Sequence, residues 1–151
     1  EKEPTWTYDK NKLLFTGQDA SVQVLSANKI ESPEGQKAVR VHYKLSNTSK
    51  ETMNAYTLLM KVVLDVKQED KEVKVATMVF SQDDDRDKIA NKTKIAPKEV
   101  KEIVVDYTVA DFDHDLTIDF SDYGTEANAT AKVSLRNLEK APVKYFDKKD
   151  K

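Results

Sequence analysis

The 151-residue chain contains no cysteine, and this absence removes a whole group of functions. Without thiols there are no disulfides, no thiolate metal ligands and no cysteine nucleophile. Glycine is almost as scarce, because Gly17, Gly35 and Gly124 are the only three and stand far apart. A loop that cradles phosphate needs clustered glycines so that its backbone amides can approach the anion. The scattered glycines therefore argue against nucleotide binding through such a loop.

Long apolar runs and an excess of positive charge are also missing. No window approaches the length of apolar sequence that is needed to cross a bilayer. The 25 basic and 27 acidic residues are interspersed along the chain and give a net charge of −2. Because this balance provides no large positive field, it argues against a nucleic-acid partner.

The chain does contain a recurrent alternation of apolar and polar residues. In the stretch Val39–Leu45 the odd-numbered residues are apolar, whereas Arg40, His42 and Lys44 are polar and are expected on the wet side. Residues 103–109, 116–120 and 131–135 repeat the scheme. A period of two is typical of strands that bury one face and expose the other. Several such strands, separated by short turns, predict an all-β, immunoglobulin-like β-sandwich.

A chain of this length fits one domain with a single core. We expect an N-terminal segment at residues 1–12, the immunoglobulin-like sandwich at 13–136, and a flexible charged C-terminal tail at 137–151. The tail has lost the alternation and ends in a run of Asp and Lys residues. Such charged ends are usually mobile.

The segment Met53–Lys67 fits two kinds of structure. Leu58 and Leu59 belong to a helical face together with Val62, whereas Val62, Leu64 and Val66 alternate as in a strand. The β-branched residues and the polar turn at 69–72 favour a strand that enters a hairpin, with residues 73–80 returning.

Four motifs in strand-and-turn order resemble a known family. They are Val39–Ser49 (VRVHYKLSNTS), Gln68–Val73 (QEDKEV), Ile95–Val100 (IAPKEV) and Asp106–Val109 (DYTV). The family consists mostly of domains of unknown function in Gram-positive surface lipoproteins, and it is similar to the secreted immunoprotective antigen of mycobacteria, an immunoglobulin-like sandwich. The chain departs from the pattern at Lys98, where a glycine commonly follows the proline.

The resemblance implies export, display on the cell surface and a lipid anchor through a cysteine upstream of Glu1. It brings no catalytic residues with it. It implies a binding or structural role, and the membrane would be contacted only through the anchor.

Two acidic runs are candidate calcium ligands. Their carboxylates stand at every second position: Asp83, Asp85 and Asp87 in one run, Asp111, Asp113 and Asp115 in the other. Calcium needs several oxygen ligands that converge from a flexible segment. Neither run has the glycine or the terminal glutamate of an EF-hand loop. A solvated acidic loop is therefore the competing interpretation of each run.

No catalytic arrangement is apparent in the sequence. The two histidines, His42 and His114, lie in a polar strand position and among acids, and no nucleophile motif surrounds any serine. We therefore expect no enzyme and no cofactor. The aromatic residues near ends and turns, Trp6, Tyr8 and Tyr123, are the better candidates for surface contacts.

These observations predict a non-catalytic extracellular binding or interaction module. Its partner would be a cell-wall polymer or another surface protein, reached through an exposed sheet face, an edge strand or loops. The alternative is a calcium-dependent adhesion module or a protein inhibitor that uses the acidic loops.

Overall fold

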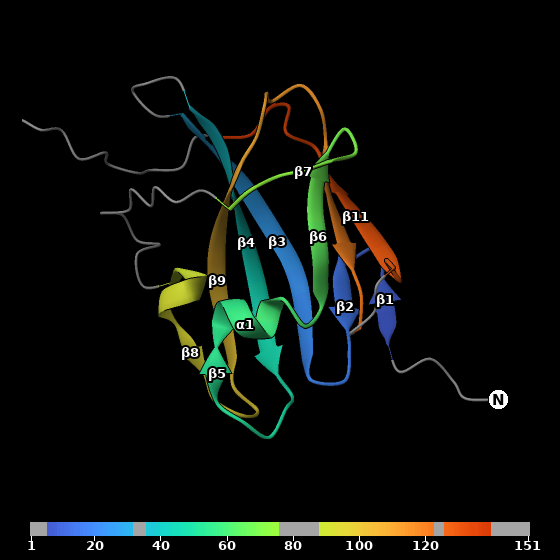
Figure 1. Cartoon of the computed structure of the whole chain (residues 1–151), viewed down its shortest axis with the longest axis vertical. Coiled ribbons are helices and arrows are strands. Elements are labelled where there is room, and N and C mark those ends of the chain that lie inside the picture. Colours follow the sequence, from blue (N-terminus) through green and yellow to red (C-terminus); the bar gives the residue numbers. More distant parts are fainter. Residues whose placement is uncertain (1–5, 32–35, 76–87, 123–125, 140–151) are drawn as a thin grey trace, which may run out of the picture.

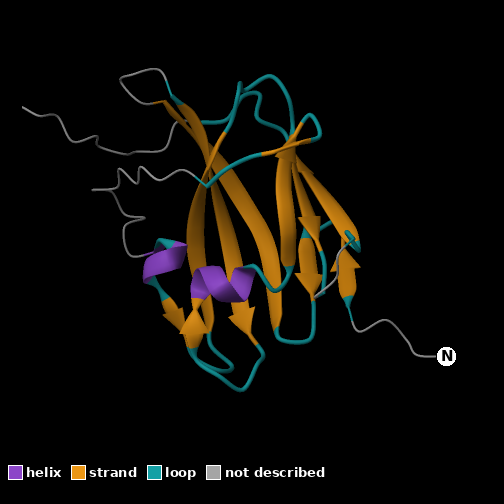
Figure 2. Ribbon diagram, viewed as in Figure 1, coloured by secondary structure: helices purple, strands orange, loops and turns teal. Residues whose placement is uncertain are grey.

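Two antiparallel sheets pack face to face and enclose one core (Figures 1 and 2). The computed structural model describes residues 6–31, 36–75, 88–122 and 126–139. The larger sheet has the strand order β1-β2-β3-β4-β9 and the smaller one β11-β10-β6-β7. This architecture confirms the predicted all-β sandwich class, whereas its immunoglobulin-like type stays a prediction.

The strands divide between the two sheets as follows. The larger sheet contains β1 (Thr7–Asp9), β2 (Leu14–Thr16), β3 (Ala20–Glu31), β4 (Lys37–Asn47) and β9 (Val100–Thr108). The smaller sheet contains β6 (Val63–Gln68), β7 (Lys71–Glu72), β10 (Leu116–Phe120) and β11 (Ala129–Val133). The short strands β5 (Met53–Asn54) and β8 (Lys94–Ile95) form a separate pair beside the helix α1 (Ala55–Leu59) and the 3-10 helix η2 (Ala90–Lys92). None of the helices in these described ranges is long and apolar enough to cross a membrane.

Strand β4 shows where the alternation holds and where it fails. Val39, Val41, Tyr43 and Leu45 are fully buried in the core, as predicted. The expectation that Arg40 lies on the wet side is wrong, because its side chain is 0% exposed. The reason is that the outer face of the sheet is also covered here: Val104 and Asp106 are 3% and 6% exposed, and Ile89 bridges to Val104. A polar side chain that points away from the core therefore still loses its contact with water.

The prediction of one strand across residues 53–67 is wrong in its first half. The side-chain Oδ1 of Asn54 accepts hydrogen bonds from the backbone amides of Tyr56 at 2.9 Å and Thr57 at 3.4 Å. An asparagine in this position satisfies amides that a helix start leaves unpaired. The chain therefore forms the five-residue helix α1, buries Leu58 and Leu59, and becomes extended only in β6.

The turn between β8 and β9 uses a strained residue. Lys98 has φ = 68°, and the amide of Glu99 donates a 3.0 Å hydrogen bond to the carbonyl of Ala96. Pro97 followed by a residue with positive φ is typical of a type II turn, in which glycine is preferred at the second position. Lys98 thus adopts a conformation that glycine takes more easily. The turn is held in place because the amide of Lys98 donates to the carbonyl of Asn47 at 2.7 Å.

Both ends of the described chain contact the sandwich. β1 lies within the segment 1–12 and pairs with β2, and Trp6 stacks on Phe15 with ring centroids 5.8 Å apart. At the other end Leu138 packs against the core, and the carbonyl of Glu139 accepts a hydrogen bond from the amide of Lys29.

Aromatic stacking joins the two sheets. Phe120 of β10 stacks on Phe15 of β2 with centroids 5.4 Å apart and contacts Tyr8 at 5.6 Å. We expect Phe120→Ala to lower the free energy of unfolding by about 3–5 kcal/mol, because it opens a cavity between the sheets. Urea unfolding measures the loss. The half-buried Phe112 lies outside this stack, so Phe112→Ala is the matched control, and an equal loss in both variants would contradict the role of the stack.

Candidate binding site

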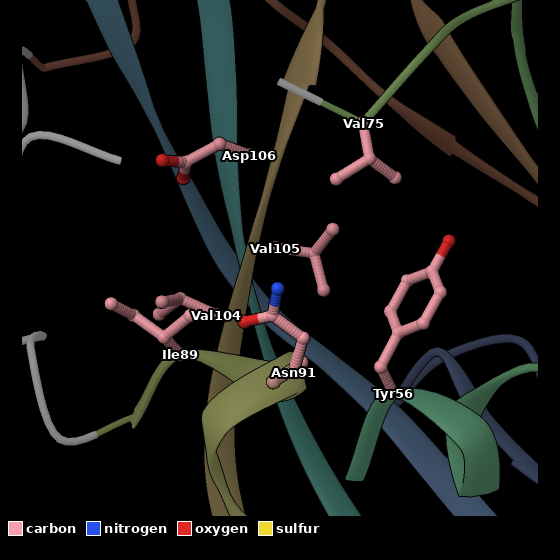
Figure 3. A pocket seen from close by; sticks show the side chains of 8 residues that line it. Tyr56, Val75, Ile89, Asn91, Val104, Val105 and Asp106 are labelled. Atoms are coloured by element: carbon pink, nitrogen blue, oxygen red, sulfur yellow. The ribbon is translucent and has the colours of Figure 1, made fainter. Parts of the chain in front are cut away.

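An apolar pocket of about 170 Å³ lies beside β9, the outermost strand of the larger sheet (Figure 3). Its walls come from four separate parts of the chain: β9, the segment after β7 that contains Val75, the region of η2, and α1. The lining residues are Tyr56, Val75, Ile89, Ala90, Asn91, Val104, Val105 and Asp106.

The floor of the pocket is held by α1 and η2. The Asn54 side chain that begins α1 also donates from Nδ2 to the carbonyl of Asn91, at 2.8 Å. One side chain therefore fixes both the helix that carries Tyr56 and the turn that carries Asn91. In Figure 3 the Tyr56 hydroxyl points towards Val75 across the pocket.

The back wall is β9 itself, which is paired at two points on its outer side. Ile89 forms a parallel bridge with Val104, and Val75 forms an antiparallel bridge with Tyr107. The amide of Thr108 also donates to the carbonyl of Lys74 at 2.8 Å. The pocket lies between these two attachments, so its width is set by backbone pairing.

Among the described lining residues Asp106 carries the only charged side chain, and this side chain is paired with Arg40. Nε of Arg40 lies 2.8 Å from Oδ1 of Asp106, and Nη2 lies 3.0 Å from Oδ2. Arg40 is 0% and Asp106 6% exposed. A two-pronged pair of this kind is among the strongest hydrogen-bonded contacts that side chains make. The described lining residues therefore present little net charge to a ligand.

Two tyrosines lie buried in the core on β4 and β9. The hydroxyls of Tyr43 and Tyr107 are 2.8 Å apart and hydrogen-bonded. Burial raises the pKa of both groups above the ordinary value, and the neighbouring Tyr56 adds to the effect. Both phenols are consequently neutral, and they serve as structural groups.

The volume of the pocket limits what it can hold. Pockets for drug-sized ligands and cofactors have volumes of roughly 300–1,000 Å³ and are mostly apolar with a few polar groups. At about 170 Å³ this pocket is smaller. Its size and its apolar walls suit a single apolar side chain.

The candidate calcium ligands divide into two groups. Asp83, Asp85 and Asp87 lie outside the described residues. Asp111 uses its carboxylate within its own loop: Oδ1 accepts hydrogen bonds from the amides of Asp113 at 2.9 Å and His114 at 3.1 Å.

In the described part of the chain no group of three or more His, Asp and Glu side chains is placed to hold a metal ion. Asp113 and Asp115 are exposed. Calcium binding by the two loops stays a prediction.

His114 lies between two carboxylates. Its Nδ1 is 2.9 Å from Oδ1 of Asp111, and its Nε2 is 2.7 Å from Oε1 of Glu69. The hydrogen bond with Asp111 raises the pKa of His114, with Glu69 contributing, and the same bond lowers the pKa of Asp111. Gln68, nearby, donates from Nε2 to the carbonyls of Asp111 and His114. These contacts fasten the loop before β10 to the end of β6.

The remaining candidate side chains are occupied in packing or pairing. Nε2 of His42 is 2.7 Å from Oδ1 of Asn28 on the neighbouring strand. Trp6 and Tyr8, expected at the surface, pack on Phe15 and Phe120. Tyr123 lies outside the described residues.

No motif in the amino-acid sequence indicates the pocket. One signal was present, because Val104 is apolar where the alternation calls for a polar residue. Its side chain is 3% exposed and lies under Ile89, on the side of the sheet opposite to the core residue Val105. The other lining residues come from segments whose proximity no local pattern reveals.

The fold and the pocket define a two-sheet β-sandwich with a small apolar recess beside an outer strand. The amino-acid sequence places it in a family: residues 1–122 match the family described as "Domain of unknown function (DUF5067)", and the chain belongs to it. No curated protein sequence matches the chain.

Two solved structures share the fold. A protein described as "putative lipoprotein from Staphylococcus aureus subsp. aureus NCTC 8325" has a TM-score of 0.75 at 11% identity, over 94% of this chain and 98% of that one. A protein from Enterococcus faecalis, solved by NMR, has a TM-score of 0.68 at 17% identity, over 85% of this chain and 92% of that one. At these identities the likeness establishes the fold alone. Similarity to the mycobacterial antigen stays a prediction.

The Arg40–Asp106 pair gives a first prediction for this region. Arg40→Leu should lower the free energy of unfolding by about 3–5 kcal/mol, because it leaves the buried carboxylate of Asp106 without its partner. The double variant Arg40→Leu/Asp106→Leu should recover most of that loss, since no lone charge is left inside. Chemical unfolding of the parent, both single variants and the double variant measures the coupling. Additive losses would contradict the pairing argument.

His114 gives a second prediction. A histidine whose pKa is raised by folding adds stability that is complete below its unfolded pKa and is lost as pH rises through the folded pKa. Stability of the parent should therefore fall as pH rises above about 6.5, the ordinary histidine pKa, and His114→Gln should make that fall smaller.

An NMR titration of the His114 ring, alongside urea unfolding between mildly acidic and mildly basic pH, tests this expectation. His42→Gln is the control, because it retains His114 and its two carboxylates. A ring that titrates at or below the ordinary histidine value would contradict the prediction.

Proposed function

We propose that the chain is a non-catalytic extracellular binding module of a Gram-positive surface lipoprotein. The proposal extends the family membership, which carries no assigned function, and the likeness in fold to the Staphylococcus aureus protein. In this proposal the lipid anchor holds the domain at the cell surface, and the domain itself performs no chemistry.

The observation that carries the proposal is the pocket beside β9. Aliphatic side chains form most of its walls, and its carboxylate is paired with Arg40. Burying one leucine-sized side chain in such a place provides about 1.5–3 kcal/mol. We infer that the pocket receives an apolar side chain of a protein partner.

A cell-wall polymer is the less favoured partner. Sugar rings are usually bound on exposed aromatic faces, and two of the three aromatic residues expected at the surface are engaged in packing: Trp6 stacks on Phe15, and Tyr8 contacts Phe120. A protein partner agrees better with an aliphatic recess than a polysaccharide does.

The test blocks the pocket without disturbing the core. Val75 is 40% exposed on the rim, so Val75→Glu should introduce a charge at the pocket and leave the fold intact. N-acetyl-leucinamide and N-acetyl-phenylalaninamide are the probes, and backbone NMR shifts of Val104 to Asp106 report their binding. We expect Val75→Glu to weaken the binding of these probes about tenfold or more.

Val100→Glu is the matched control. Val100 is also an exposed valine, 48% exposed, but it lies at the start of β9 and outside the pocket lining. This variant should bind the probes as the parent does. Binding that Val75→Glu leaves unchanged, or probe-induced shifts confined to other strands, would overturn the proposal. A surface protein retained by the parent and Val100→Glu, but not by Val75→Glu, would identify the partner.

A further inference from the structure

Two acidic side chains face each other across the smaller sheet. In the antiparallel pairing of β6 with β10, Asp65 stands directly opposite Asp119, next to a register shift between Asp119 and Phe120. Like charges in directly opposed positions destabilise a sheet. The position of both residues is fixed by the register of the ladder, so the two carboxyl groups cannot separate without disturbing the strand pairing.

The surroundings distinguish the two carboxyl groups. Asp119 accepts a 2.8 Å hydrogen bond from the hydroxyl of Thr130 on β11. Asp65 has a buried oxygen, Oδ1, for which the described chain offers no donor. A carboxylate oxygen that is buried without a donor disfavours ionisation, whereas a protonated carboxyl group can itself donate. The proton therefore belongs on Asp65, and Asp119 is the acceptor.

The other charged groups on this face do not remove the conflict. Nζ of Lys67 lies 3.9 Å from Oδ2 of Asp65 and 3.7 Å from Oδ2 of Asp119, so one cation serves two acids. Glu72 of β7 stands opposite Lys67 and adds a further negative charge near Asp65. On β11 the register places Lys132 on the same face, opposite Thr117 and two residues from Thr130.

We propose that Asp65 and Asp119 share one proton, and that this proton makes the β6–β10 pairing a pH-sensitive joint. With the proton in place, Asp65 donates to Asp119 and the strands are joined by a side-chain hydrogen bond. When the proton leaves, two carboxylates oppose each other with Lys67 between them, and the smaller sheet loses stability.

The direction of the titration agrees with this arrangement. Burial raises the pKa of Asp65 to about 6, with the hydrogen bond to Asp119 adding to the effect. For Asp119, burial acts against ionisation, but the hydrogen bonds from Asp65 and Thr130 outweigh it and lower its pKa. A carboxyl group with a raised folded pKa stabilises the protein at low pH, and the contribution is lost as pH rises through the folded value. The sensitive window is therefore about pH 4 to 6.

The test combines a site-resolved titration with a neutral substitution. Carbon-detected NMR of the side-chain carboxyls should show Asp65 titrating near pH 6. Asp65→Asn keeps a donor for Asp119 and removes the titrating proton. Between pH 5 and 7.5 the equilibrium constant for unfolding should increase in both proteins or in the parent alone. The factor of increase should be about ten times larger for the parent than for Asp65→Asn.

Asp70→Asn is the matched control. Asp70 is exposed in the β6–β7 turn at φ = 64°, a conformation that asparagine tolerates. This variant should retain the parent's pH dependence. An Asp65 carboxyl that titrates near the ordinary aspartate value would overturn the proposal even if Asp65→Asn failed to fold. The same conclusion would follow if Asp65→Asn folded and kept the parent's pH dependence.

Discussion

The ion pair between Arg40 and Asp106 is the contact on which the β4–β9 side of the larger sheet depends. It joins β4 to β9 through two hydrogen bonds, and both partners are almost completely removed from water. Transferring two charges out of water costs several kcal/mol for each ion, and only good geometry offsets that cost. Because the outer side of β4 and β9 is covered, in part by the segment that bridges Ile89 to Val104, each of these buried charges requires the other as its partner.

The pocket results from the same segments that cover the outer side of β9. Ile89 and Val75 attach to β9 at two separate points, and the recess lies between them. Because Asp106 is paired with Arg40, the described lining of the recess carries little net charge although a carboxylate belongs to it. This apolar recess is the feature on which the proposed binding role rests.

The carboxyl groups of the smaller sheet have a different kind of partner. Asp106 faces a guanidinium, whereas Asp65 faces another aspartate with a single lysine between them. In the first case ionisation is supported by a dedicated partner. In the second case ionisation of Asp65 is disfavoured by Asp119, and in our proposal a shared proton supplies the positive charge that Lys67 alone does not provide. The two sheets are thus expected to respond differently to pH although both contain carboxylates on strands.

The alternation along the chain determined the all-β class and the cores of the long strands, because a period of two depends only on local backbone geometry. The amino-acid sequence could not show that Asn54 would begin a helix. The residues after Asn54 fit both a helix and a strand, and the hydrogen bonds from Tyr56 and Thr57 to the Asn54 side chain are visible only in the structure. Nor could the sequence show that Arg40 is buried or that Asp65 opposes Asp119. Strand pairing, and the packing of further segments on the outer face of the larger sheet, bring together residues that are distant in the sequence. Only the tertiary structure therefore decides which side chains are removed from contact with water.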